Sequence, residues 1–465
     1  MSQGLRVNLG LMGGVVLFAL LTSVSQLAAL ATAFGLVVCA SAVHRLENLP
    51  KVILFAIVAL VPLSYLHTQV TFGSFNSLTK LLFVPAFAVL ILDWFVSRRP
   101  IILGRQGFFV AVFGLLLVIS SLSNGGNPHS LYFITRFFSM FLLFFLCANV
   151  IRRKSDLAML LTVMVVASLV SAMSSMVPGA SISFGEGGSY ARSIGWSFDD
   201  PPTFGTNVLM ALLVSVYFLF VTRKMWLRLV LLPVIAILAL AIVQTYARGI
   251  FVVGMVSIGF LLFRIRHRIS LPVALAVAGL LAVCLLPLIP HTYWDRVSSL
   301  FNHFGFDATI NRRLASLRIG YQLFTQNPFL GFGPGNFMMH YMAPEFRFDH
   351  TGIPSVCFNL YLSIAAQSGL LGLAAFGLIL WETFREMRFV TRSYGERDSF
   401  LKQAVEVLEV IIVAFLIVSL YEPTDLHKYM WIVFGAVAAA GHIRREQLAA
   451  LAARPAETTD DPALS

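Results

Sequence analysis

The residues of this sequence most suited to chemistry are arginines that stand in unexpected places. They lie in connections between apolar segments, on the side of the predicted membrane where positive charge is usually scarce: Arg192, Arg248, Arg296, Arg312, Arg313, Arg318 and Arg347. A guanidinium stays charged at neutral pH, and its planar fork can bind two oxygens of one phosphate. The pattern therefore predicts a site for a phosphate-bearing anionic group.

Arg248 is the most informative of these arginines because it lies in Thr245–Gly249, a very short turn between two apolar runs. For any single arginine, the alternative is a pair with lipid headgroups or with nearby carboxylates such as Asp199 and Asp295. So tight a turn favours a functional role for Arg248.

Arg136 is a separate case, because it lies within the apolar run 130–150. A charge inside a membrane span is costly and usually functional. At the shallow depth of Arg136 the side chain can equally reach the interface by snorkelling, so both interpretations stay open.

Groups able to transfer a proton stand at the end of the longest connection: His340, Glu345, Asp349 and His350. Each of them has the alternative of being a solvated loop residue. No spacing typical of a metal site is present, so we predict no bound metal. The glycines of Gly331–Gly335 have neither the preceding strand nor the following Lys-Ser/Thr of a nucleotide-binding loop.

Membrane spans are the elements that must position these residues. Of the 465 residues, 58% are hydrophobic and only 12% are charged, which excludes an ordinary soluble protein. About 12–14 helical spans are expected, because roughly 20 apolar residues cross a bilayer. The apolar runs lie near 10–25, 27–43, 51–67, 78–97, 107–122, 130–150, 157–177, 204–222, 227–244, 249–263, 271–289, 355–381, 404–420 and 427–443.

The basic residues indicate the orientation of these spans. The formal net charge of +11 is spread over alternate short connections, which is typical of cytoplasmic loops and not of a nucleic-acid surface. This pattern predicts that both termini are cytoplasmic and that the long loop 290–354 lies outside. Within that loop, Asn311–Gln326 has the pattern of an amphipathic helix lying at the membrane surface.

The sequence divides into four regions on this basis. They are N-terminal transmembrane helices at 1–177, a core at 178–383 that includes the outer loop, C-terminal transmembrane helices at 384–445, and a disordered cytoplasmic tail at 446–465. The predicted fold is an all-α, polytopic transmembrane protein with one long extracytoplasmic loop.

Three motifs, in this order along the chain, resemble the O-antigen ligase and O-antigen polymerase superfamily. Arg192–Pro202 is similar to the family's Arg, Gly and Asp-Pro element. Thr245–Gly249 is similar to its Thr-x-Ser-Arg-Gly turn, with Ala247 in place of Ser. Phe324–Phe337 is similar to its Asn-Pro, Gly-x-Gly and Gly-x-Phe segment.

A fourth motif departs from the family at one position. After the outer loop the family has a His, then Asn, Ser or Gln, then nine residues and Gly-x-x-Gly. Here Asn359, Gly369 and Gly372 hold the later positions, but Phe358 stands in place of the histidine on which family ligases rely. Either another group, His350 foremost, takes its place, or this member does different work.

The resemblance implies an inner-membrane glycosyltransferase that uses an undecaprenyl-diphosphate-linked glycan on the periplasmic side. It would invert the anomeric centre, need no metal or other cofactor, and act in exopolysaccharide or lipopolysaccharide biosynthesis. Its partners would be the lipid-linked glycan, a glycan or lipid acceptor, membrane lipids and a chain-length regulator. His350 and Arg248 would be catalytic, and the substrate-binding candidates would be Arg136, Arg192, Arg312, Arg313 and Asn359.

Several functions stay open at this point. Phe358 favours a repeat-unit polymerase over a ligase that transfers O-antigen to lipid A-core. A transporter or flippase of the lipid-linked glycan is a rival, although such proteins usually carry charges at mid-membrane depth. An inactive scaffold of a glycan assembly complex is a third reading of the missing histidine.

Overall fold

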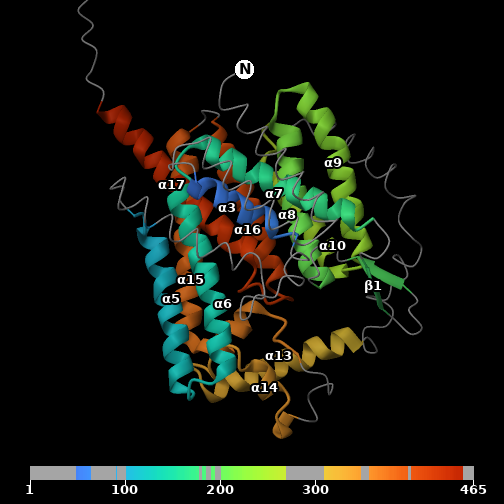
Figure 1. Cartoon of the computed structure of the whole chain (residues 1–465), viewed down its shortest axis with the longest axis vertical. Helices are drawn as coiled ribbons and strands as arrows, with labels where there is room; N and C mark the ends of the chain where they lie inside the picture. The colour runs from blue at the N-terminus through green and yellow to red at the C-terminus, as the bar shows by residue number, and fades with distance from the viewer. Residues whose placement is uncertain are drawn as a thin grey trace, which may run out of the picture.

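The computed structural model describes residues 49–63, 91, 101–176, 181–184, 190–193, 200–268, 308–346, 355–395 and 399–453. In these parts the chain is helical apart from one two-stranded antiparallel hairpin, and most helices form an elongated bundle (Figure 1). The elements are α3 (Leu49–Leu60), α5 (Gly104–Ser123), α6 (Pro128–Val150), α7 (Lys154–Ser174), β1 (Ser181–Phe184), β2 (Tyr190–Ser193), α8 (Pro201–Val221), α9 (Met225–Gln244), α10 (Arg248–Arg264), α13 (Ala308–Gln326), α14 (Phe337–Tyr341), α15 (Leu360–Tyr394), α16 (Phe400–Val418) and α17 (Lys428–Ala452).

Six of the described helices are long and apolar enough to cross a membrane: α5, α6, α7, α8, α9 and α15. Each coincides with an apolar run identified in the sequence, so the predicted all-α, polytopic fold is confirmed. The runs at 249–263, 404–420 and 427–443 are also helical, as α10, α16 and α17. Those at 10–25, 27–43 and 271–289, and all but Ile91 of 78–97, lie outside the described residues.

The core of the bundle is built from apolar and aromatic side chains shared between helices that are distant in sequence. Trp431 of α17 is fully buried and meets Phe137 of α6 edge-on, with 5.3 Å between the ring centroids. Large apolar side chains also point outward from the spans, for example Leu115 and Leu122, which are 59% and 69% exposed. A hydrocarbon solvent would cover such a surface favourably, as a membrane protein requires.

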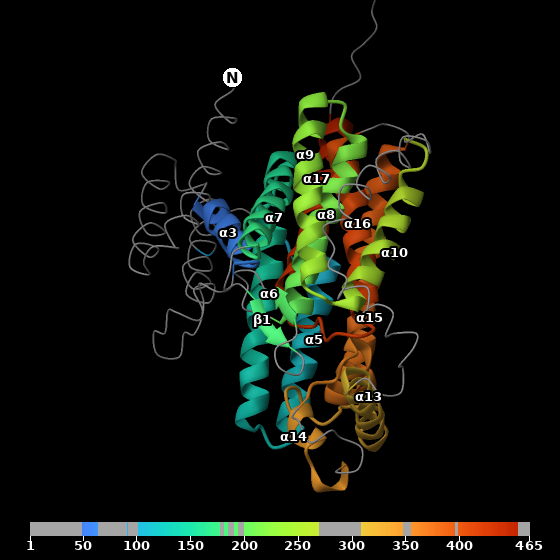
Figure 2. The same ribbon diagram turned by 90° about the vertical axis from the view of Figure 1, so that its right-hand side faces the viewer.

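The two ends of the bundle differ in their polar groups. At one end, arginines from the basic connections pair with glutamates: Arg264 with Glu409 at 3.1 Å, and Arg268 with Glu406 at 3.1 Å. At the other end, α13 lies across the bundle beneath the lower ends of α10 and α15, as the two views show (Figure 2). The arginines of α13 and α10 are thus separated from the basic connections by the length of the helices.

At this second end, a break in α15 contacts the loop segment 328–332. Gly369 has φ +68° and ψ −168°, which interrupts the helix, and a Cβ there would lie 2.1 Å from the carbonyl oxygen of Phe329. The loop fills the break: Leu370 donates its N–H to the carbonyl of Pro328, and Phe332 donates to that of Ala366. The Asn-Pro and Gly-x-Gly motif therefore packs against α15 at this break.

The helix predicted at Asn311–Gln326 is confirmed as α13, but its apolar stripe is not the face that packs on the protein. Ser316, Ile319 and Leu323 are buried, whereas Leu314 and Tyr321 are 55% and 62% exposed. An exposed apolar stripe on a helix that lies across the bundle is the geometry expected of a helix at a membrane surface.

Candidate functional site

The turn that carries Arg248 is held rigidly. The Thr245 hydroxyl donates to the Ile242 carbonyl at 2.7 Å and accepts the N–H of Ala247 at 3.1 Å, while Tyr246 takes the left-handed conformation with φ +50°. Arg248 is then the first residue of α10. The tight turn predicted from the sequence is confirmed.

Tyr421 connects this turn to the arginines of α13. A Cβ on Gly249 would lie 2.7 Å from Cε2 of Tyr421, so the ring rests directly on the first turn of α10. The same ring has the Arg313 guanidinium 5.4 Å from its centroid, and the Tyr421 carbonyl accepts a hydrogen bond from Arg313. Residues from α10 and α13 are thereby brought to one place.

Arg312 and Arg313 both face the ring of Phe358, the residue that precedes the N-cap of α15. Their Cζ atoms lie 5.3 Å and 4.8 Å from the ring centroid, within the range of a cation–π interaction. Nε of Arg312 is buried without a hydrogen-bond partner among the described residues. The Phe358 ring cannot accept a proton, but it makes cation–π contacts with the guanidinium groups of Arg312 and Arg313.

Asn359 has a defined structural role beside Phe358. Its side-chain oxygen accepts the N–H of Leu362 at 2.9 Å and so caps α15, and its Nδ2 donates to the Leu420 carbonyl at 3.0 Å. Asn359 therefore holds the start of α15 against the segment 419–427 between α16 and α17. Contact with a substrate remains a prediction for this residue.

Arg313 also makes an ion pair with Glu422 in that segment, with 2.6 Å between a guanidinium nitrogen and Oε1. The Glu422 side chain is only 12% exposed. Burial raises the pKa of Glu422 to about 7, and nearby Asp200 adds to the rise, while Arg313 and Arg312 act against it.

The other predicted site residues are less closely joined to this cluster. Arg136 is exposed on α6, with its Cζ 5.8 Å from the Tyr132 ring centroid. Burial raises the pKa of Asp425 in the segment 419–427 to about 6, and the charge of Arg136 acts against that rise. Arg192 lies on β2, opposite Ile182 of β1. His350 lies outside the described residues.

Part of the sequence that carries these residues matches a known protein family. Residues 233–377, from within α9 to within α15, match the family model described as O-antigen ligase. Over these residues the chain is similar to the O-antigen ligase and polymerase superfamily. The resemblance stated from the motifs is confirmed over the matched residues, and the long apolar helices are those of a membrane protein. No curated protein matches the chain significantly.

The matched segment contains some of the candidate residues and leaves out others. Arg248, Arg312, Arg313 and Asn359 lie within it, whereas Glu422 lies beyond its end. Glu422 and Asp425 were missed in the sequence. The signal available was the pair of acids in Glu422-Pro423-Thr424-Asp425, a short connection between two apolar runs on the side of the arginines.

The glycine-rich segment and His340 support the site from one side. Gln367 of α15 accepts the N–H of Gly335 through its side chain at 2.6 Å, and Asn124 donates to the Gly331 carbonyl at 3.0 Å. The ring of His340 lies against Phe332, with 4.6 Å between centroids, and burial lowers the pKa of His340. These glycines thus pack the loop onto α5 and α15, which explains them without a nucleotide.

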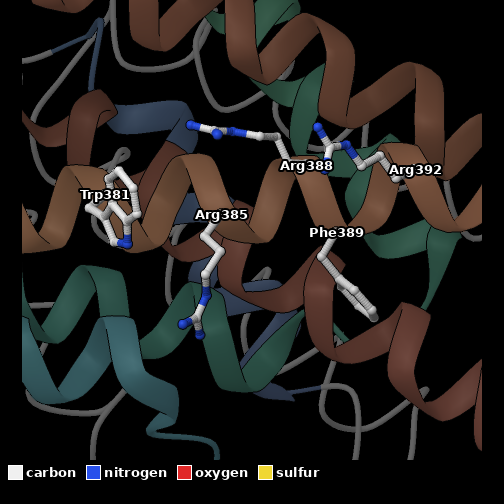
Figure 3. A pocket seen from close by; sticks show the side chains of 5 residues that line it. All are labelled: Trp381, Arg385, Arg388, Phe389 and Arg392. Atoms are coloured by element: carbon white, nitrogen blue, oxygen red, sulfur yellow. The ribbon is translucent and has the colours of Figure 1, made fainter.

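A basic pocket is present at the far end of α15, lined by Trp381, Arg385, Arg388, Phe389 and Arg392. Arg388 and Arg392 point to one side of the helix and Arg385 to the other (Figure 3). Arg385 pairs with Glu382 at 2.8 Å. This pocket belongs to the end with the basic connections and is separate from the cluster around Phe358.

Proposed function

We propose that this protein is a glycosyltransferase that acts on a glycan carried by undecaprenyl diphosphate, at the outer face of the bacterial inner membrane. The observation that carries the proposal is the contact of Tyr421 both with the first turn of α10, which begins at Arg248, and with Arg313. Arg312 and Arg313 also lie over the ring of Phe358, at the end of the bundle opposite the basic connections. Guanidinium groups fixed at one place suit a diphosphate and the charge that grows on it as it leaves.

The reaction follows from that arrangement. An acceptor hydroxyl attacks the anomeric carbon from the face opposite the diphosphate, so the configuration inverts. The bond between the anomeric carbon and the diphosphate oxygen breaks, and its electron pair stays on the diphosphate, where Arg248 and the α13 arginines stabilise it. Arg192 and Arg136 are further candidates for holding the lipid-linked glycan, and neither a metal nor a nucleotide is required.

A repeat-unit polymerase is the favoured version, because Phe358 replaces the histidine on which family ligases rely. The alternative is transfer of O-antigen to lipid A-core, and the family model that matches is described as O-antigen ligase. Comparing the glycans of a deletion strain with those of its parent distinguishes the two. Loss of long chains supports the polymerase, whereas long chains that persist but are not attached to lipid A-core contradict it.

A direct assay separates enzyme from transporter. The full-length chain, purified in detergent, is given an undecaprenyl-diphosphate oligosaccharide, and the product size is measured by mass spectrometry. Elongation without a membrane to cross supports a transferase and excludes a flippase as the sole activity. No change in product size, with donor and acceptor both present, would defeat the proposal.

A further inference from the structure

Transfer of a glycan to an acceptor hydroxyl releases the proton of that hydroxyl. Phe358, at the position of the family histidine, cannot accept this proton. An acceptor hydroxyl is a weak nucleophile until a base removes its proton, and such a base is typically worth about 10²–10⁴ in rate. Phe358 occupies the position of the family histidine, and its ring has no titratable group. A carboxylate close to the α13 arginines would meet the need.

We propose that Glu422 is the catalytic base of this transferase, an inference that rests on the proposed function. Its carboxylate is fixed in the cluster by the Arg313 ion pair at Oε1, at 2.6 Å. Within the described part of the chain, no hydrogen bond engages its second oxygen, Oε2. That oxygen is therefore the one able to receive a proton.

The proton and electrons balance in a single displacement. The hydroxyl proton of the acceptor moves to Oε2 of Glu422 while the hydroxyl oxygen bonds to the anomeric carbon. The bond from that carbon to the diphosphate breaks, and the diphosphate leaves with the electron pair and is held by the arginines. Glu422 later releases its proton to water and returns to the carboxylate.

The electrostatic surroundings suit this task. Arg313 and Arg312 of α13 favour the carboxylate, while burial and Asp200, at the start of α8, oppose it, and Tyr421 of the same segment lies beside the pair. The resulting pKa of about 7 leaves a substantial fraction of Glu422 ionised at neutral pH, and it makes that fraction a better proton acceptor than an ordinary carboxylate.

Asp425, the other acid of the segment, is less suited. Burial raises its pKa to about 6, while the backbone at Asp425 and Leu426 acts against that rise, and no ion pair fixes its carboxylate among the described residues. His427 also lies in this segment, but its ring packs against Phe415 with 5.0 Å between centroids, and both nitrogens are buried. Glu422 is thus the acid that combines an anchored oxygen with an open one.

The test uses purified full-length protein and an undecaprenyl-diphosphate oligosaccharide, with kcat and KM measured separately. For Glu422→Gln we expect kcat to fall by about 10²–10⁴, with the donor KM changed little. Glu409→Gln is the matched control, because Glu409 likewise pairs with an arginine, Arg264 at 3.1 Å, but lies within α16 at the other end of the bundle. Its kcat should stay near wild type. A Glu422→Gln protein that keeps more than about a tenth of the wild-type kcat overturns the proposal.

The pH profile supplies a readout that does not need that variant to fold. Wild-type kcat should rise as pH increases through the pKa of Glu422, since only the carboxylate accepts a proton. Asp200→Asn removes a negative neighbour, so this rise should move to lower pH. An unmoved profile contradicts the role of Glu422. Wild-type protein that does not elongate the donor at all defeats the proposed function instead, so the two failures are distinguishable.

Discussion

The guanidinium of Arg313 lies 4.8 Å from the ring centroid of Phe358, the residue that stands where family ligases have a histidine. The same guanidinium makes an ion pair with Glu422 at 2.6 Å. An aromatic ring at this position therefore orients a cation, and the proton transfer that a histidine would perform has to be done elsewhere. Phe358 in place of the histidine is compatible with an active enzyme in which Phe358 orients the arginine and a second residue, Glu422 in our proposal, accepts the proton.

Phe358→Leu tests the supporting role of the ring. The leucine keeps an apolar contact but removes the cation–π interaction, which is worth about 0.5–2 kcal/mol, so we expect the donor KM to rise roughly 2–30-fold. Phe358→Tyr keeps the ring face and should retain wild-type KM. Equal KM values for the leucine and tyrosine variants would show that the ring does not position the arginines.

Arg313→Ala tests the diphosphate site itself. Loss of the guanidinium removes a charge that stabilises the leaving diphosphate, and it also leaves Glu422 without its partner, so transfer should fall by on the order of 10²–10³. Arg313→Lys keeps the charge without the fork and should be intermediate. The control is Arg388→Ala in the basic pocket, which removes the same charge from the far end of α15. Comparable losses in the Arg388 and Arg313 variants would argue against a local site on α13.

The sequence alone was sufficient to predict the helical elements and to single out the arginines as candidates for the site. Apolar runs predicted the spans, and the pattern of Asn311–Gln326 predicted α13 to its last residue. The unusual placement of Arg248, Arg312 and Arg313 was visible because charge outside the basic connections is rare. Such features depend on local composition, which a single sequence displays.

The sequence could not reveal what depends on contacts between distant segments. Arg313 and Glu422 are 109 positions apart, and no periodicity relates α13 to the turn after α16. The packed face of α13 was also hidden, because Gly320 allows a close approach there: a Cβ on it would lie 3.1 Å from Cδ2 of Leu362 in α15. Ile319 and Leu323 are therefore buried beside it, and the stripe with Leu314 and Tyr321 is not.

Gly249→Ala tests the contact that joins α10 to the site. The added methyl would lie 2.7 Å from the Tyr421 ring, which must move and take the Arg313 contact with it. We expect a loss of stability of about 1–3 kcal/mol and a larger loss of transfer activity, measured by thermal unfolding in detergent and by product size. Gly259→Ala is the control on the same helix, because nothing lies within 4 Å of a Cβ there. If both alanine variants behave like wild type, the contact between Tyr421 and α10 is unimportant.

Gly369→Ala tests whether the break in α15 supports the site. Alanine at φ +68° is strained, and its methyl would lie 2.1 Å from the Phe329 carbonyl oxygen, so the loop segment that fills the break must be displaced. Strain and overpacking each cost about 1–3 kcal/mol, so we expect a marked fall in the unfolding temperature together with loss of transfer. Gly377→Ala, further along α15 in open space, should leave both properties intact. Because Asn359 and Phe358 are positioned by the part of α15 before the break, a Gly369→Ala protein with full activity would show that the loop and the site are independent.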